Sequence, residues 1–279
     1  MKFSVIVNTQ SGSVPADGAG QIADELKNLG HDFEIHSVEG ADLGDVWSAQ
    51  DFTGLDGIIA WGGDGTLSFI LAKASERSIP VLPLPGGTMN LLPKQIHGNA
   101  CEWKTCLRDA LSSRRSQSVP GMRIGETMCY VGILIGRLTR LARSREHLRS
   151  GELGSAVETL VGQDVLNLKT RLEVQDEDDI WDATALGVFV PEDGSGPMDI
   201  ASIDPDNLAE LVEMGLESLM GQWRTASGVL QKTARSIEIG VKDAGKVSVT
   251  LDGEPGELET PFTIEFHEKA AEVWSARPE

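Results

Sequence analysis

Cysteine is scarce in this chain of 279 residues, which contains only Cys101, Cys106 and Cys129. Three thiols form no even disulfide framework, and the spacing of Cys101 and Cys106 lacks the nearby histidine pair that would suggest a zinc site. A reducing, cytoplasmic setting is therefore the expectation.

Positive charge is also in short supply: 24 lysines and arginines face 43 aspartates and glutamates, which leaves a net charge of −19. A surface of this sign disfavours nucleic acid as a partner. Long apolar runs are missing as well. No stretch approaches the ~20 apolar residues of a membrane span, and the opening run is too short for a signal peptide. Any membrane contact is expected to be peripheral.

One stretch departs from this acidic composition, because five arginines crowd a segment with helical spacing. They are Arg137, Arg140, Arg143, Arg145 and Arg149. A solvated helix face would explain them. Contact with anionic lipid headgroups is the functional alternative, and it would bring the protein to a lipid surface. A homodimer is also compatible with the sequence.

The length suits two domains, and the first part of the chain alternates strand and helix patterns. Short apolar runs predict strands at 3–8, 33–38, 55–61 and 80–84. Between them, apolar residues recur at helical spacing, first at Ile22, Ala23, Leu26 and Leu29 and later at Leu67, Ile70, Leu71 and Ala74. This alternation predicts an α/β domain with a parallel sheet, whose ligands bind at the carboxyl ends of the strands.

The pattern becomes strand-rich near residue 117. Strand-like runs occupy 128–135, 168–175, 184–190, 236–241 and 246–251, and helical stretches are expected near 138–161 and 205–220. We predict an α/β domain over 1–117, joined by the tail 267–279, and a β-rich domain of antiparallel sheets over 118–266.

A glycine-rich loop, Gly62-Gly63-Asp64-Gly65-Thr66, follows the third predicted strand and precedes a helix. Such a loop offers convergent backbone N–H groups to a phosphate, and glycine allows close approach and positive φ. Asp64 would repel phosphate unless a cation or a proton lies between them, so it is a candidate Mg²⁺ ligand or base. An ordinary turn after a buried strand is the alternative.

A second loop, Gly86-Gly87-Thr88-Met89-Asn90, follows the next strand. Thr88 and Asn90 offer a hydroxyl and an amide to a phosphate or a ribose, although alone this loop reads as a capped helix start. Two such loops at neighbouring strand ends together favour a nucleotide site.

A third element is Asp252-Gly253-Glu254, for which two geometries are open. Asp-Gly between alternating apolar residues is a hairpin signal. If the chain instead reverses at 254–257, Asp252 and Glu254 point to the same side at a strand end. There, two carboxylates could bind Mg²⁺ and accept a proton from an alcohol.

Taken in order, these motifs resemble the diacylglycerol kinase catalytic domain family, which includes bacterial soluble lipid kinases, sphingosine kinases and ceramide kinases. The resemblance is carried by the opening strand with Asn8, the two glycine loops, and the late strands that end in Asp252-Gly253-Glu254. It implies an α/β nucleotide-binding domain, a β-sandwich-like second domain, an active site in the cleft between them, and the cofactors ATP and Mg²⁺.

Site residues are carried over by position. The expected nucleotide contacts are Asn8, Gly62, Gly63, Asp64, Gly65, Thr66, Gly87, Thr88 and Asn90. The expected catalytic residues are Glu254, Asp64 and Asp252, with Asp64 and Asp252 as metal ligands, and the base is either Asp64 or Glu254. The implied activity is ATP-dependent phosphorylation of a hydroxyl of diacylglycerol or of a sphingoid or ceramide-type lipid. Alternatives are a non-catalytic regulatory member and a kinase for a soluble acceptor such as NAD.

Departures from the family pattern weigh against naming the lipid. Ser68-Phe69 follow the first glycine loop and Leu91-Leu92-Pro93 follow the second, where the family commonly has other residues.

Overall fold

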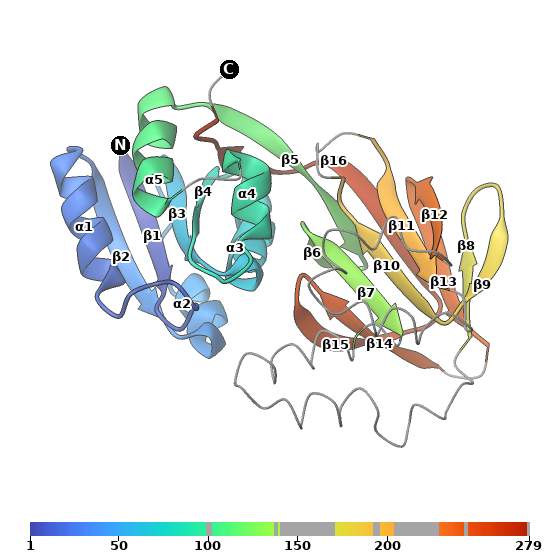
Figure 1. Ribbon diagram of the computed structural model, residues 1–279. Helices are drawn as coiled ribbons and strands as arrows, with labels where there is room; N and C mark the ends of the chain where they lie inside the picture. The colour runs from blue at the N-terminus through green and yellow to red at the C-terminus, as the bar shows by residue number, and fades with distance from the viewer. Residues whose placement is uncertain are drawn as a thin grey trace. The chain divides into compact units, whose positions relative to one another are not determined.

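The structure is a computed structural model, and it describes residues 1–98, 102–136, 139, 171–191, 196–203, 229–242 and 245–277 (Figure 1). The chain divides into two compact units. The first comprises Met1–Gly121 and His267–Glu279, and the second comprises Met122–Pro191 and Gly196–Phe266. The predicted helices at 138–161 (apart from Thr139) and 205–220 lie outside the described residues. So do the five arginines Arg137, Arg140, Arg143, Arg145 and Arg149.

The first unit is built on a parallel sheet with the strand order β2-β1-β3-β4, followed by the end of β16. Its strands are β1 (Lys2–Asn8), β2 (Asp32–Val38), β3 (Gly57–Gly62), β4 (Val81–Pro85) and β16 (Phe262–Trp274). Its helices are α1 (Gly18–Asn28), η1 (Gly40–Asp42), α2 (Leu43–Ser48), α3 (Asp64–Ser75), α4 (Leu91–His97) and α5 (Trp103–Ser113). The predicted α/β fold is confirmed, and η1, α2, α4 and α5 are additions that the apolar pattern did not predict.

Strands β1 and β3 are buried along nearly their whole length, as expected for a parallel sheet covered on both faces. On one face, Phe3, Val5 and Val7 share a core with residues of α1 and α5. The inward stripe predicted for α3 is confirmed, because its four apolar residues are all buried. The helix predicted from Ile22, Ala23, Leu26 and Leu29 is confirmed as α1, in which Leu29 is the C-cap residue and is 37% exposed.

The C-terminal segment is part of the first unit. Val273 of β16 pairs in parallel with Val81 of β4. Beyond the strand, the Ser275 hydroxyl donates to the carbonyl of Ile96 at 2.8 Å, and the Ala276 N–H donates to Nδ1 of His97 at 3.1 Å. His97 Nε2 lies 2.7 Å from the carbonyl of Pro83, which can only accept, so the buried ring is neutral with its proton on Nε2.

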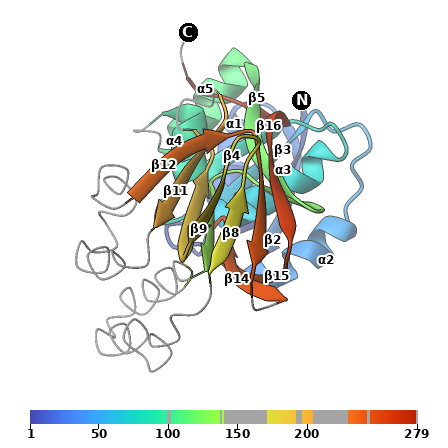
Figure 2. The ribbon, with the colours of Figure 1, turned by 90° about the vertical axis from the view of Figure 1, so that its right-hand side faces the viewer.

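The second unit is a β-sandwich, in line with the predicted β-rich domain. One sheet has the order β12-β11-β10-β7-β14-β15, and the other contains β16-β13-β8-β9 with β5 and β6 attached (Figures 1 and 2). The strands not yet given are β5 (Ser116–Ile124), β6 (Thr127–Cys129), β7 (Gly132–Gly136), β8 (Leu172–Gln175), β9 (Ile180–Ala183), β10 (Ala185–Phe189), β11 (Met198–Ile203), β12 (Val229–Ala234), β13 (Ser236–Val241), β14 (Lys246–Leu251) and β15 (Glu254–Glu259). Alternate residues of both sheets form one shared core.

Two strand predictions in this unit need correction. The run 128–135 is not one strand, because the chain breaks between β6 and β7 at Tyr130 and Val131, whose N–H groups bond to a side chain instead of a neighbouring strand. The acidic turn 176–179 joins β8 to β9, so the strand that follows it directly is Ile180–Ala183 and β10 comes after it. β13 and β14 have the predicted bounds.

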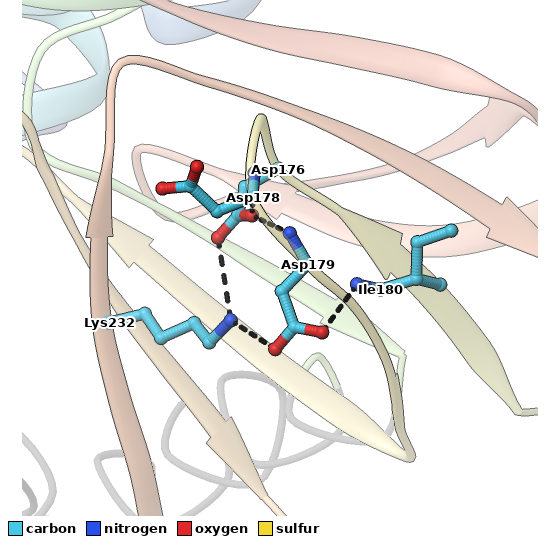
Figure 3. A network of polar contacts seen from close by, with 5 residues as sticks. All are labelled: Asp176, Asp178, Asp179, Ile180 and Lys232. Atoms are coloured by element: carbon cyan, nitrogen blue, oxygen red, sulfur yellow. Dashed lines mark hydrogen bonds and ion pairs between the residues drawn. The ribbon is translucent and has the colours of Figure 1, made fainter.

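The acidic turn is held by Lys232 of β12 (Figure 3). Lys232 Nζ lies 2.8 Å from Asp179 Oδ2 and 3.5 Å from Asp176 Oδ2, and it stands 4.0 Å from the centre of the Trp181 ring. The hydrogen bond from Lys232 lowers the pKa of the Asp179 carboxyl. One cation therefore links the edge strand of one sheet to the β8–β9 hairpin of the other.

Two further observations bear on the setting of the chain. Across the described ranges, no helix combines the length and the apolar character that crossing a bilayer requires. Cys129 is a buried free thiol, whereas Cys106 is disulfide-bonded, contrary to the expectation of unpaired thiols.

Candidate functional site

The first glycine loop places the N-terminus of α3 directly after β3. Gly63, in extended conformation, is the residue before the helix, and no side chain caps it. Among the described residues, the N–H groups of Asp64, Gly65 and Thr66 have no hydrogen-bond partner. Three such donors at the positive end of a helix dipole form a site for an anion such as phosphate.

Side chains from the segment after β1 hold this loop in place. The Gly63 N–H donates to the Ser11 hydroxyl at 3.0 Å. Asn8, which is buried, donates from Nδ2 to the Thr66 hydroxyl at 2.8 Å and accepts the Gln10 N–H through Oδ1 at 3.0 Å. Both polar atoms of Asn8 are thus used within the protein. Asn8 therefore orients Thr66, and the Thr66 hydroxyl keeps its proton to donate elsewhere.

The two glycine loops pack backbone against backbone. A Cβ atom at Gly87 would lie 2.8 Å from the Gly63 Cα, and one at Gly86 would lie 3.0 Å from the Gly62 Cα. None of these four glycines has a positive φ. Of the two expected reasons for glycine, close approach of the backbone is therefore confirmed and positive φ is not. Three of the four positions need glycine because any side chain would meet a neighbouring atom at 2.8 Å or less.

The second loop is closed on itself by Asn90, which is in the left-handed region with φ 50°. Asn90 Oδ1 accepts the Gly87 N–H at 2.7 Å, and Nδ2 donates to the Gly87 carbonyl at 3.0 Å. The amide therefore shapes the loop, whereas the Thr88 side chain is exposed and has no partner within the described part of the chain. Of the two polar residues predicted here, Thr88 is the one available to a ligand.

Asp64 connects the two loops. Its Oδ1 accepts the N–H of Leu92 at 2.9 Å, in the first turn of α4, which Asn90 does not cap. Burial raises the pKa of the Asp64 carboxyl, and the N–H groups of Leu92, Leu91 and Asn90 oppose that rise. Asp64, the first residue of α3, thus caps α4.

Asp252 lies in the second unit, at the turn between β14 and β15. Leu251 pairs with Glu254, and Asp252 and Gly253 have φ of 47° and 95°, so the loop is a two-residue type I′ hairpin turn. The hairpin geometry is therefore the one adopted, and the reversal considered at 254–257 was wrong because those residues belong to β15. The Asp252 carboxylate accepts three backbone N–H groups, from Tyr130 at 2.7 Å and from Val131 and Gly132 at 2.9 Å.

Glu254 is the first residue of β15. Its side chain is exposed, and its carboxylate has no hydrogen-bond or ion-pair partner among the residues that the structure describes. Of the three carboxylates predicted to be catalytic, Asp64 and Asp252 are bonded to backbone donors, and only Glu254 is unengaged.

The residues of the first unit fit a nucleotide phosphate and its Mg²⁺. The unpartnered N–H groups of α3 suit the phosphate, and the hydroxyls of Thr66 and Thr88 can add donors. Mg²⁺ commonly binds one or two carboxylates, several waters and the phosphates themselves, so Asp64 alone is a sufficient protein ligand. Within the described ranges, no group of three or more His, Cys, Asp or Glu residues could hold a metal without such a ligand.

Sequence reasoning missed the two serines that shape this site. Ser11 accepts from Gly63, and Ser13 bonds the second loop, with its N–H on the Gly86 carbonyl at 2.9 Å and its hydroxyl on the Gly87 carbonyl at 3.0 Å. The only signal was their position in a polar segment directly after a buried strand, where side chains reach the carboxyl end of the sheet.

The fold and the loops define a class: an α/β unit with an anion site at a helix N-terminus, followed in the chain by an antiparallel β-sandwich. Residues 2–124 match the family model of the diacylglycerol kinase catalytic domain. This segment therefore belongs to that family, as its motifs suggested.

Solved structures share the fold over almost the whole chain. The crystal structure of a protein named "putative diacylglycerol kinase" from Bacillus anthracis str. Sterne superposes with a TM-score of 0.71 at 17% identity, covering 98% of this chain and 96% of that one. A diacylglycerol kinase from the same organism superposes with a TM-score of 0.66 at 15% identity, covering 98% of this chain and 96% of that one. At such identities the likeness establishes the fold.

Proposed function

We propose that this chain is an ATP-dependent lipid kinase, which transfers the terminal phosphoryl group of ATP to a hydroxyl of diacylglycerol or of a sphingoid or ceramide-type lipid. The observation that carries the proposal is the N-terminus of α3, where three consecutive N–H groups have no partner in the described part of the chain. The family of residues 2–124 supports the lipid as acceptor.

On the donor side, phosphoryl transfer depends mainly on positioning and on neutralising the phosphate charge. The α3 N–H groups bind phosphate oxygens, and the Thr66 hydroxyl, oriented by Asn8, donates to another. When bound, Mg²⁺ supplies positive charge to the phosphates, and Asp64 is the residue that holds it. A nearby cation also favours the ionised form of Asp64, whose pKa burial raises.

On the acceptor side, Glu254 is the proposed base, since its carboxylate is exposed and has no partner within the described part of the chain. It accepts the proton of the lipid hydroxyl as the oxygen attacks phosphorus. Asp64 is less suited to this role because one of its oxygens already caps α4.

Membrane contact through Arg137, Arg140, Arg143, Arg145 and Arg149 remains part of the proposal, with vesicle binding by an all-glutamine variant as its test.

The test is incubation of the protein with γ-labelled ATP, Mg²⁺ and, separately, diacylglycerol, a sphingoid base, ceramide and NAD. Label transferred to one of the lipids is the expected result. Label on NAD alone would replace the lipid with a soluble acceptor. ATP binding without transfer to any acceptor would favour a non-catalytic nucleotide-binding member of the same fold.

A further inference from the structure

The Asp252 side chain ties its turn to a different segment of the second unit. Its two oxygens accept the N–H groups of three consecutive residues, Tyr130, Val131 and Gly132. Its own N–H donates to the Gly132 carbonyl at 2.9 Å. Four hydrogen bonds therefore fix the turn to residues 130–132, which follow β6 and include the first residue of β7.

Two of these three donors lie outside any strand. Tyr130 and Val131 lie between β6 and β7, so a neighbouring strand does not use their N–H groups, and Tyr130 is fully buried. Buried N–H groups need an acceptor, and the Asp252 carboxylate is that acceptor. In return, the three dipoles compensate its negative charge.

The turn also sets where the next carboxylate points. Gly253 separates Asp252 from Glu254, and Glu254 pairs with Leu251 as the first rung of the β14–β15 ladder. Because side-chain direction alternates along a strand, fixing the turn fixes the side of the hairpin on which Glu254 lies.

We propose that Asp252 is a positioning residue, which acts through Tyr130, Val131 and Gly132 to present Glu254, and that it is not a Mg²⁺ ligand. This role rests on the proposed function. Recruiting the Asp252 oxygens to Mg²⁺, which demands near-octahedral geometry, would take them from three backbone donors and leave those unpaired.

Asp252→Asn distinguishes a positioning residue from a Mg²⁺ ligand, and Gly253→Ala is measured in parallel. Asn-Gly is a favoured type I′ pair, so Asp252→Asn keeps the turn but turns one acceptor into a donor that faces an N–H group. Gly253→Ala alters no ligand and meets no atom within 4 Å, yet it strains a residue with φ of 95°. Both changes therefore disturb the position of Glu254.

For both variants we expect kcat to fall about ten-fold or more, because a displaced catalytic group loses its alignment. The KM for ATP and the Mg²⁺ concentration for half-maximal rate should change by less than about two-fold, since ground-state binding is untouched. A Mg²⁺ midpoint raised about ten-fold in Asp252→Asn, with the rate restored by excess Mg²⁺, would overturn the proposal. So would a normal kcat in Gly253→Ala.

A second readout does not depend on activity. Amide hydrogen exchange at Tyr130, Val131 and Gly132 should be faster in Asp252→Asn than in the wild type and unchanged in Glu254→Gln. Equal protection in Asp252→Asn would show that the carboxylate does not hold these groups. If the wild type transfers no phosphate, the proposed function and the catalytic role of Asp252 fail together, whereas the exchange result still decides whether Asp252 anchors the turn.

Discussion

Among the described residues, the backbone donors of the first unit's glycine loop have no partner, and in the second unit the carboxylate that follows the β14–β15 turn has none. In both places an aspartate beside the unengaged group is itself bonded to backbone N–H groups: Asp64 to α4, and Asp252 to the chain after β6. Backbone N–H donors can bind the oxygens of a phosphate, and a carboxylate can accept the proton of an alcohol. The two units thus offer complementary chemistry, and each uses an aspartate to shape its part.

The strongest test of this contrast is Glu254→Gln, which keeps the size of the exposed side chain but removes its basicity. We expect kcat to fall by about 10²–10⁴-fold, the usual contribution of a general base. ATP binding, which we propose for the first unit, should be unchanged, as measured by titration calorimetry. Glu257→Gln is the matched control, because Glu257 is also exposed on β15. Equal rates in the wild type and Glu254→Gln would remove Glu254 from the mechanism.

A second test concerns pH and the first unit alone. Burial lowers the pKa of His97 from 6.5 to about 4. The unfolded chain therefore binds a proton at this histidine more readily than the folded chain. The contribution of neutral His97 to the free energy of unfolding is complete above pH 6.5 and is lost as the pH falls toward 4. The protein then loses at most about 3 kcal/mol of unfolding free energy, because each pKa unit corresponds to about 1.36 kcal/mol.

Urea unfolding of the wild type and of His97→Gln at a series of pH values measures this effect. The variant should show the shallower dependence between pH 6.5 and 4. Parallel curves would mean that His97 does not titrate in this window.

A third test probes how tightly the two glycine loops are packed. Gly87→Ala places a Cβ against the Gly63 Cα, and neither backbone can yield easily. We expect a loss of about 1–3 kcal/mol of unfolding free energy, as for other overpacked sites, together with weaker ATP binding. Gly20→Ala is the control, because Gly20 is exposed in α1 with nothing within 4 Å, and alanine there should stabilise by about 0.5–1 kcal/mol. A neutral Gly87→Ala would contradict the backbone contact.

The smallest expected effect lies in the second unit, at Lys232. Lys232→Met removes the contacts with Asp179 and Asp176 and the cation over Trp181, and should cost a small, measurable amount of unfolding free energy. Lys242→Met removes a half-exposed lysine that bridges Glu173 and Asp182, and should cost less unfolding free energy than Lys232→Met. Equal costs would show that the aromatic contact adds nothing.

The fold was predictable where burial imposes a clear pattern. The four parallel strands, the stripe of α3 and the bounds of β13 and β14 follow from apolar runs and alternation. The run 128–135 misled because its N–H groups are taken by a residue about 120 positions away. No local pattern reports a partner at that distance.

The candidate site was predictable in its residue types but not in their bonding. Glycine marked both loops and Asp64 marked the first, and of the two expected reasons for glycine only close approach of the backbone applies. Asn8 and Asn90 were expected to face the ligand, and instead they hold Thr66 and the second loop. Each of these outcomes depends on side-chain distances that only the folded chain defines.

The docked segment after β16 has a consequence for the order of events during synthesis. The sheet of the first unit is completed by Val273, and α4 is tied down by Ser275 and Ala276. These residues leave the ribosome only after every strand of the second unit has been made. Until translation has passed the whole β-sandwich, the N-terminal unit therefore lacks the partner of the outer β4 edge and the donor to Nδ1 of His97, so it is completed last.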